Sequence, residues 1–233
     1  MNRQTFLKSS LLASGAAVSA SFIRAQPVAD EEGRGPGRGP RTDLRKVYEF
    51  VQAAHRDLPK VKSMLAADSA LIHARWDWGD GDWESGLEGA AHMGQREIVR
   101  YLLTQGARND VFSAAMLGHT ETVKAMIDLE TATVDSRGPH GINLMFYVGY
   151  GGKPAMADAI LQHVEDRGPQ CNRAIHTATL SNHVELVGWL IENGATDINT
   201  PNFFDKTPLD AATERGFTEL AELLRQHGGV SAL

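Results

Sequence analysis

The chain has 233 residues, of which 42% are hydrophobic, enough apolar material for one or two folded domains. Its formal net charge of −6 argues against the basic faces that nucleic-acid binders present, so we expect no nucleic-acid partner. A single cysteine, Cys171, excludes an intramolecular disulfide.

Residues 1–25 predict an export signal peptide. Arg3 and Lys8 precede an apolar run of mostly small residues at 11–23, which is short for a membrane span. The opening resembles the twin-arginine signal of bacteria, except that Gln4 replaces the second arginine, so a general secretory route stays open. An uncleaved amphipathic helix is the structural alternative. We expect a bacterial protein that is periplasmic or otherwise exported, with no membrane insertion after signal cleavage.

Residues 26–42 predict a flexible linker. Glycines alternate with arginine and proline between Gly33 and Pro40. No strand precedes them and prolines interrupt them, so we exclude a phosphate-binding loop.

Residues 43–233 predict a repeat domain. A helical phrase of small residues followed by an apolar stripe recurs at a spacing of about 33 residues. Its six starting positions are Gln52, Ala90, Ala114, Val148, Ala178 and Ala212. Four residues later, the first helix of a pair should end at a residue that tolerates a left-handed backbone. These residues are Gly94, Gly118, Gly152, Asn182 and Gly216, whereas the first unit has Arg56.

Two further phrases carry a family resemblance. The run Thr-Pro-Leu-Asp at 207–210 resembles the helix-opening Thr-Pro-Leu-His of ankyrin repeats, and Gly-Ala at 194–195 resembles their closing phrase. The chain is therefore similar to the ankyrin-repeat family from about residue 43 to 229. The resemblance implies an all-α solenoid of about six stacked helix pairs with short β-turn or finger connections. It also implies a non-catalytic protein-interaction scaffold with a concave face, no cofactor and no enzyme activity. We expect a monomer.

The sequence departs from the repeat at two adjacent connections. The long one, 75–84, holds three of the four tryptophans, and the short one, 105–113, leaves too little chain for a finger. One interpretation is a structural plug, in which the long loop folds over the gap and touches Val111 and Phe112. The other is a binding patch on the finger face. The residues assigned to partner binding are Trp76, Asp77, Trp78, Asp80, Asp82 and Trp83, with His140 and Tyr150 of the unusual fourth unit.

Three alternatives concern ligands. The tryptophan and acidic side chains of loop 75–84 suit a carbohydrate or other small molecule, or a hydrolase. Asp80, Asp82 and Glu84 alternate as calcium ligands do, although the EF-hand pattern fails at its glycine and at its final glutamate. The glycines around Tyr150 predict a loose helix or room for a ligand.

The remaining histidine pair predicts no metal site. His176 and His183 are seven residues apart, but each occupies a position where ankyrin repeats use histidine for loop hydrogen bonds. With no zinc-binding His-Glu-x-x-His helix or nucleophile motif in the chain, we assign no catalytic and no metal-binding residue.

Overall fold

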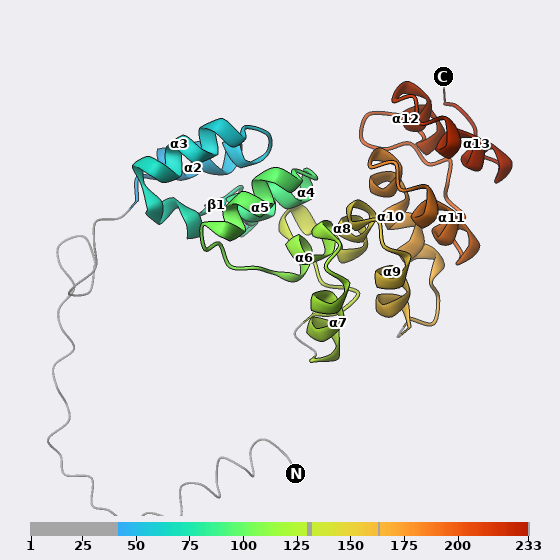
Figure 1. The fold of residues 1–233 in the computed structure, drawn as a ribbon, viewed down its shortest axis with the longest axis horizontal. Coiled ribbons are helices and arrows are strands. Elements are labelled where there is room, and N and C mark those ends of the chain that lie inside the picture. Colours follow the sequence, from blue (N-terminus) through green and yellow to red (C-terminus); the bar gives the residue numbers. More distant parts are fainter. Residues whose placement is uncertain (1–41, 130–131, 163, 233) are drawn as a thin grey trace, which may run out of the picture. The chain divides into compact units, whose positions relative to one another are not determined.

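The structure, a computed structural model, describes residues 42–129, 132–162 and 164–232 (Figure 1). The predicted export signal and the linker as far as residue 41 lie outside the described residues.

Helix pairs follow one another along the described part of the chain, as the repeat spacing predicts (Figure 1). The six pairs are α2 (Leu44–Ala54) with α3 (Leu58–Ala67), α4 (Gly86–His92) with α5 (Arg96–Thr104), α6 (Val111–Leu117) with α7 (Thr120–Asp128), α8 (Leu144–Gly151) with α9 (Pro154–Leu161), α10 (Gly168–Leu180) with α11 (Val184–Glu192), and α12 (Pro208–Glu214) with α13 (Thr218–Gln226). Four short elements connect them: the 3₁₀ turns η1 (Ser69–His73) and η2 (Pro139–Gly141) and the strands β1 (Arg75–Asp77) and β2 (Trp83–Ser85).

The first helices end where the sequence predicts. The four glycines and Asn182 all have left-handed backbone, with φ from 56° at Asn182 to 80° at Gly118. That conformation turns the chain directly into the second helix of each pair. At the beginning of a first helix, Thr207 and Asp210 form a capping box that starts α12. The ankyrin-like run Thr-Pro-Leu-Asp at 207–210 therefore has a local structural role.

The core lies between neighbouring pairs. Each first helix packs against the next, from α2 through α12, and the second helices α7, α9, α11 and α13 form the adjoining layer. Alanines at the repeat positions 90, 114, 178 and 212 are fully buried, which lets the first helices approach closely. The terminal pairs bury one face each, with Phe50 and Val61 at the start and Leu220 and Leu224 at the end.

The glycines of α8 serve this close packing. A Cβ at Gly149 would lie 2.0 Å from Thr177 Oγ1 and 2.4 Å from the Ala174 carbonyl oxygen of α10. A Cβ at Gly151 would lie 2.3 Å from the Ala115 carbonyl oxygen of α6. The hypothesis that these glycines make room for a ligand is therefore wrong, because neighbouring helices fill the space.

The capping box at α12 predicts a pH dependence of stability. A hydrogen bond from the Ser231 hydroxyl, followed by backbone donors of Ala232 and Thr207, lowers the pKa of Asp210 to about 2. A carboxyl with a lowered folded-state pKa stabilises the fold above its unfolded value of 3.8, and this contribution is lost as pH falls toward 2. The free-energy difference between wild type and Asp210→Asn should therefore be largest above pH 4 and shrink toward pH 2. Urea unfolding of both proteins across this range measures it, and a constant difference would contradict the prediction.

Candidate functional site

The tryptophan-rich segment forms a β-hairpin. β1 pairs antiparallel with β2, placing Trp76 opposite Glu84, and the turn between them contains Gly79, Asp80 and Gly81 with positive φ. Because side chains alternate across a strand, Trp83 points outward while Glu84 points inward and is completely buried. Arg75 on β1 binds Glu88 of α4 at 2.5 and 2.7 Å, which fixes the hairpin to the second repeat.

The hairpin reaches across the short connection to the fourth repeat. The chain enters α6 directly after residues 107–110, without a finger. Asp82 in the hairpin turn accepts two hydrogen bonds from His140 of η2, from its backbone N–H at 2.8 Å and its ring Nδ1 at 2.7 Å. The hairpin thus hydrogen-bonds to η2, just before the fourth helix pair, whereas the plug interpretation placed its contacts at Val111 and Phe112.

The surroundings of the three hairpin tryptophans also differ from the plug interpretation. Trp76 and Trp78 pack edge-on against Tyr48 of α2, with ring centroids 5.1 and 6.0 Å apart, and the Trp78 ring also lies 6.0 Å from that of His140. Trp83 lines an open cleft together with Phe112. The expected partners Val111 and Phe112 are therefore not what holds Trp76 and Trp78.

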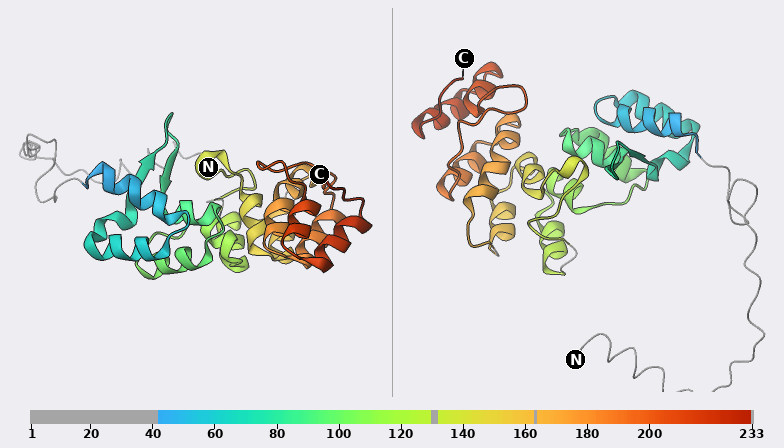
Figure 2. Two further views of the ribbon diagram at one scale, coloured as in Figure 1. Left: turned by 90° about the horizontal axis from the view of Figure 1, so that it is seen from above. Right: turned by 180° about the vertical axis from the view of Figure 1, so that it is seen from behind.

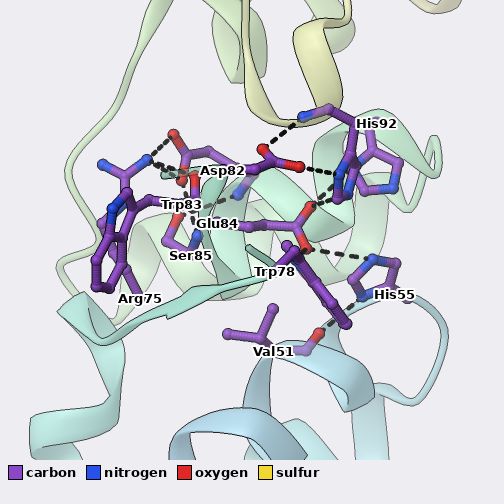
Figure 3. A network of polar contacts seen from close by, with 11 residues as sticks. Val51, His55, Arg75, Trp78, Asp82, Trp83, Glu84, Ser85 and His92 are labelled. Carbon is purple, nitrogen blue, oxygen red and sulfur yellow. Dashed lines mark hydrogen bonds and ion pairs between the residues drawn. The ribbon is translucent and has the colours of Figure 1, made fainter. Parts of the chain in front are cut away.

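Four side chains lie close together at the hairpin, and Figure 3 labels three of them, His55, Glu84 and His92. His55, Glu84, His92 and His140, here called the Glu84 cluster, each offer a ligand-type atom, and these atoms all lie within 4.8 Å of one another. Glu84 Oε1 lies 2.9 Å from His92 Nδ1 and 3.5 Å from His140 Nε2. Glu84 Oε2 lies 3.5 Å from His55 Nε2.

Each member of the cluster is positioned by its local structure. His55 directly follows α2 and its Nδ1 lies 2.8 Å from the Val51 carbonyl oxygen, to which it donates. His92 is the last residue of α4, and His140 has a left-handed backbone in η2. Gly89 of α4 leaves the room that His55 occupies, since a Cβ there would lie 3.0 Å from His55 Cε1.

Electrostatics set the charge states of two members. Burial raises the pKa of Glu84, but contacts with His92, the neighbouring imidazoles and the Trp78 indole N–H outweigh it and hold this pKa below its usual value. Burial lowers the pKa of His55. At neutral pH the cluster therefore contains a buried carboxylate and a neutral His55, whose Nδ1–H donates to the Val51 carbonyl oxygen and whose Nε2 lone pair faces Glu84.

Two buried atoms of the cluster lack a hydrogen-bond partner. Glu84 Oε1 and His92 Nδ1 are both shielded from solvent, and although they lie 2.9 Å apart, their orientation does not satisfy hydrogen-bond geometry. Glu84 Oε2, in contrast, accepts a hydrogen bond from Trp78 Nε1 at 2.8 Å.

The structure brings together seven of the eight residues predicted to bind a partner. Six lie on the hairpin, and His140 joins them through Asp82. Tyr150 lies elsewhere, half-buried against Phe146, and its carbonyl accepts from Arg96 and His183.

Sequence reasoning missed three members of the Glu84 cluster as ligands. His55 and His92 were not singled out, and Glu84 was considered only for calcium. Because Asp82 and Glu84 face imidazole nitrogens, the site mixes nitrogen and oxygen donors, whereas calcium prefers oxygen alone. The calcium interpretation is therefore wrong. The loop role of the other histidines is confirmed, since the Nε2 atoms of His176 and His183 bond to the Thr200 and Tyr150 carbonyl oxygens.

An exposed aromatic pair was also missed. Phe203 and Phe204, in the loop before α12, pack edge-on with centroids 5.7 Å apart and project into solvent. Two adjacent phenylalanines between repeats were the available signal.

Comparisons with known proteins agree with the repeat architecture. The family described as ankyrin repeats (3 copies) matches residues 144–232. The I-Kappa-B like protein C2 of Microplitis demolitor bracovirus (isolate Webb) is 35% identical over 57 residues, covering 24% of this chain and 32% of that protein. The chain thus spans about a third of that relative's length.

None of the described helices combines the length and apolar character needed to cross a bilayer. Ankyrin repeats serve as protein-interaction scaffolds, using the extended surface that stacking creates. The match identifies residues 144–232 as ankyrin repeats, and they form the carboxy-terminal part of an all-α stack of helix pairs.

Proposed function

We propose that the protein is an exported, non-catalytic scaffold that binds a protein partner through its finger edge, the edge formed by the hairpin and the loop before α12. The observation that carries this proposal is a set of large aromatic side chains exposed on the projecting connections. Trp83 on the hairpin is 51% exposed, and Phe203 in the loop before α12 is 96% exposed. Figure 2 (left) shows both connections projecting on the same side of the helices.

The chemistry of this edge suits a protein surface. A few residues carry most of the binding energy at protein interfaces, and tryptophan is enriched among them. Exposed Trp83, with exposed Phe203 and Phe204, is available for such a role. Asp77 ends β1 and Asp80 lies in the hairpin turn, so the partner should present basic groups near its apolar contact. No observation favours the carbohydrate or hydrolase alternatives.

Export belongs to the proposal as well. Its support is the basic, apolar and small-residue order of residues 1–25. Amino-terminal sequencing of the protein recovered from the periplasmic fraction tests it. A mature terminus close to residue 26 is expected, whereas intact protein confined to the cytoplasm would contradict export.

The binding edge is tested by site-specific photocrosslinking in the producing cell. A photoreactive residue at position 83 or at 203 should trap the same partner, and one at Glu222, an exposed position on α13, should trap none. Trp83→Ala and Phe203→Ala should each weaken binding of that purified partner at least tenfold. Because both side chains are exposed, the free energies of unfolding of the two variants should stay within about 0.5 kcal/mol of wild type. Equal crosslinking at all three positions, or unchanged binding by both variants, would contradict the proposed edge.

A further inference from the structure

We propose that His55, Glu84, His92 and His140 bind one divalent first-row transition-metal ion, such as Zn²⁺. The four residues come from the first, second and fourth repeats and meet beneath the hairpin.

The spacing of the donor atoms matches a four-coordinate ion. A tetrahedral ion with bonds of about 2.1 Å holds neighbouring ligand atoms about 3.4 Å apart. Glu84 Oε1 lies 2.9 Å from His92 Nδ1 and 3.5 Å from His140 Nε2, and the other oxygen, Oε2, lies 3.5 Å from His55 Nε2. With all four ligand atoms within 4.8 Å of one another, small side-chain movements would complete the shell.

Second partners orient three of the four proposed ligands. His55 Nδ1 donates to the Val51 carbonyl oxygen, and His140 Nδ1 donates to Asp82 Oδ2, so both rings turn Nε2 toward the cluster. The Trp78 indole N–H holds Glu84 Oε2. Metal-binding histidines usually have such a partner on their other ring nitrogen, and metal-binding carboxylates are hydrogen-bonded in the same way.

Two buried polar atoms that touch as an ion pair, but make no hydrogen bond, argue for a bound ligand. Glu84 is 0% exposed and His92 is 8% exposed, yet Oε1 and Nδ1 have no hydrogen-bond partner among the described residues. Leaving buried polar atoms unpaired is costly, and a coordinated cation satisfies a carboxylate oxygen and an imidazole lone pair together.

The donor set selects the class of ion. Three imidazoles and one carboxylate suit zinc and its first-row neighbours, whereas calcium and magnesium prefer oxygen ligands throughout. The carboxylates of Glu84 and Asp82 bring two negative charges to balance a divalent ion. Cys171 is buried in α10, bonded to the Asn193 carbonyl, and does not contribute.

The site has a structural rather than a catalytic arrangement. Four protein ligands fill a tetrahedral shell, whereas catalytic zinc keeps one position open. The ion would join α2, β2, α4 and η2, so it would fix the hairpin across the connection that lacks a finger.

The test uses the purified full-length chain, stripped of metal with a chelator. Co²⁺ should bind at one ion per chain and give the visible absorption of a four-coordinate nitrogen–oxygen site, and Zn²⁺ should displace it. His140→Ala should weaken Co²⁺ binding at least tenfold, and Asp82→Asn, which removes a second partner, by about 10- to 100-fold. His73 lies in η1, outside the cluster, so the His73→Ala variant should bind Co²⁺ as tightly as wild type.

Folding is controlled separately. His140 is exposed in η2, so its alanine variant should keep the wild-type circular dichroism, whereas buried Glu84 is replaced by the isosteric Glu84→Gln. A folded His140→Ala or Glu84→Gln protein that binds Co²⁺ as tightly as wild type would overturn the proposal. Wild-type protein that binds no Co²⁺ at a stoichiometric level, or binds it without four-coordinate absorption, would overturn it as well.

Discussion

Replacement of Gly149 by alanine is expected to lower the free energy of unfolding by about 3 kcal/mol. The added methyl group would meet the Thr177 hydroxyl at 2.0 Å and the Ala174 carbonyl oxygen at 2.4 Å, both on α10. Thr177 is itself held by a hydrogen bond to the Phe146 carbonyl at 2.7 Å, so the clash separates α8 from α10. Chemical unfolding followed by circular dichroism measures the loss.

The chain supplies a matched control at Gly188. This glycine lies inside α11, and a Cβ there would find Leu223 Cδ2 at 3.7 Å, an ordinary contact. Alanine favours a helix over glycine by about 1 kcal/mol, so Gly188→Ala should leave stability unchanged or raise it. Equal effects of the two substitutions would contradict the role of close packing at α8.

Zinc is expected to stabilise the folded chain by about 2.7 kcal/mol when its free concentration is 100 times the dissociation constant. The gain follows from linkage, because the Glu84 cluster assembles only when repeats one, two and four are in place. Thermal unfolding of metal-free protein, with increasing buffered Zn²⁺, measures it as a rising melting temperature.

The same titration distinguishes the cluster from weak surface binding. His140→Ala should show little rise over the same zinc range, whereas His73→Ala should follow wild type. A rise of equal size in His140→Ala would mean that zinc stabilises the protein through other groups.

Much of the fold could be predicted because each repeat carries short sequence signals that specify where its helices begin and end. The recurring small residues and the glycines at 94, 118, 152 and 216 specify helix ends through their own backbone preferences. The Thr207–Asp210 capping box is equally local. Six helix pairs follow from such signals without knowledge of distant contacts.

The Glu84 cluster could not be found in the same way. Its members are separated by 29, 8 and 48 positions along the chain, as their numbers 55, 84, 92 and 140 show, and no short motif links them. They meet because the third repeat lacks a finger, which brings Asp82 to His140. The missing finger was visible in the sequence, but its consequence depends on the size and direction of the hairpin.

Hairpin pairing also explains why Glu84 was not recognised. In the sequence it continues an acidic series with Asp80 and Asp82, which indicates a solvated loop. The register that pairs Trp76 with Glu84 instead turns its side chain into the protein, where Trp78 and three histidines surround it. A period-2 alternation over three residues is too short to establish this from sequence.

X-ray absorption at the zinc edge of the zinc-loaded, full-length protein tests directly whether the Glu84 cluster coordinates the ion. A four-coordinate ion with three imidazole nitrogens and one carboxylate oxygen at about 2.0–2.2 Å is expected. A sulfur ligand at about 2.3 Å, which would come from cysteine, or a six-coordinate oxygen shell without imidazole, would contradict it.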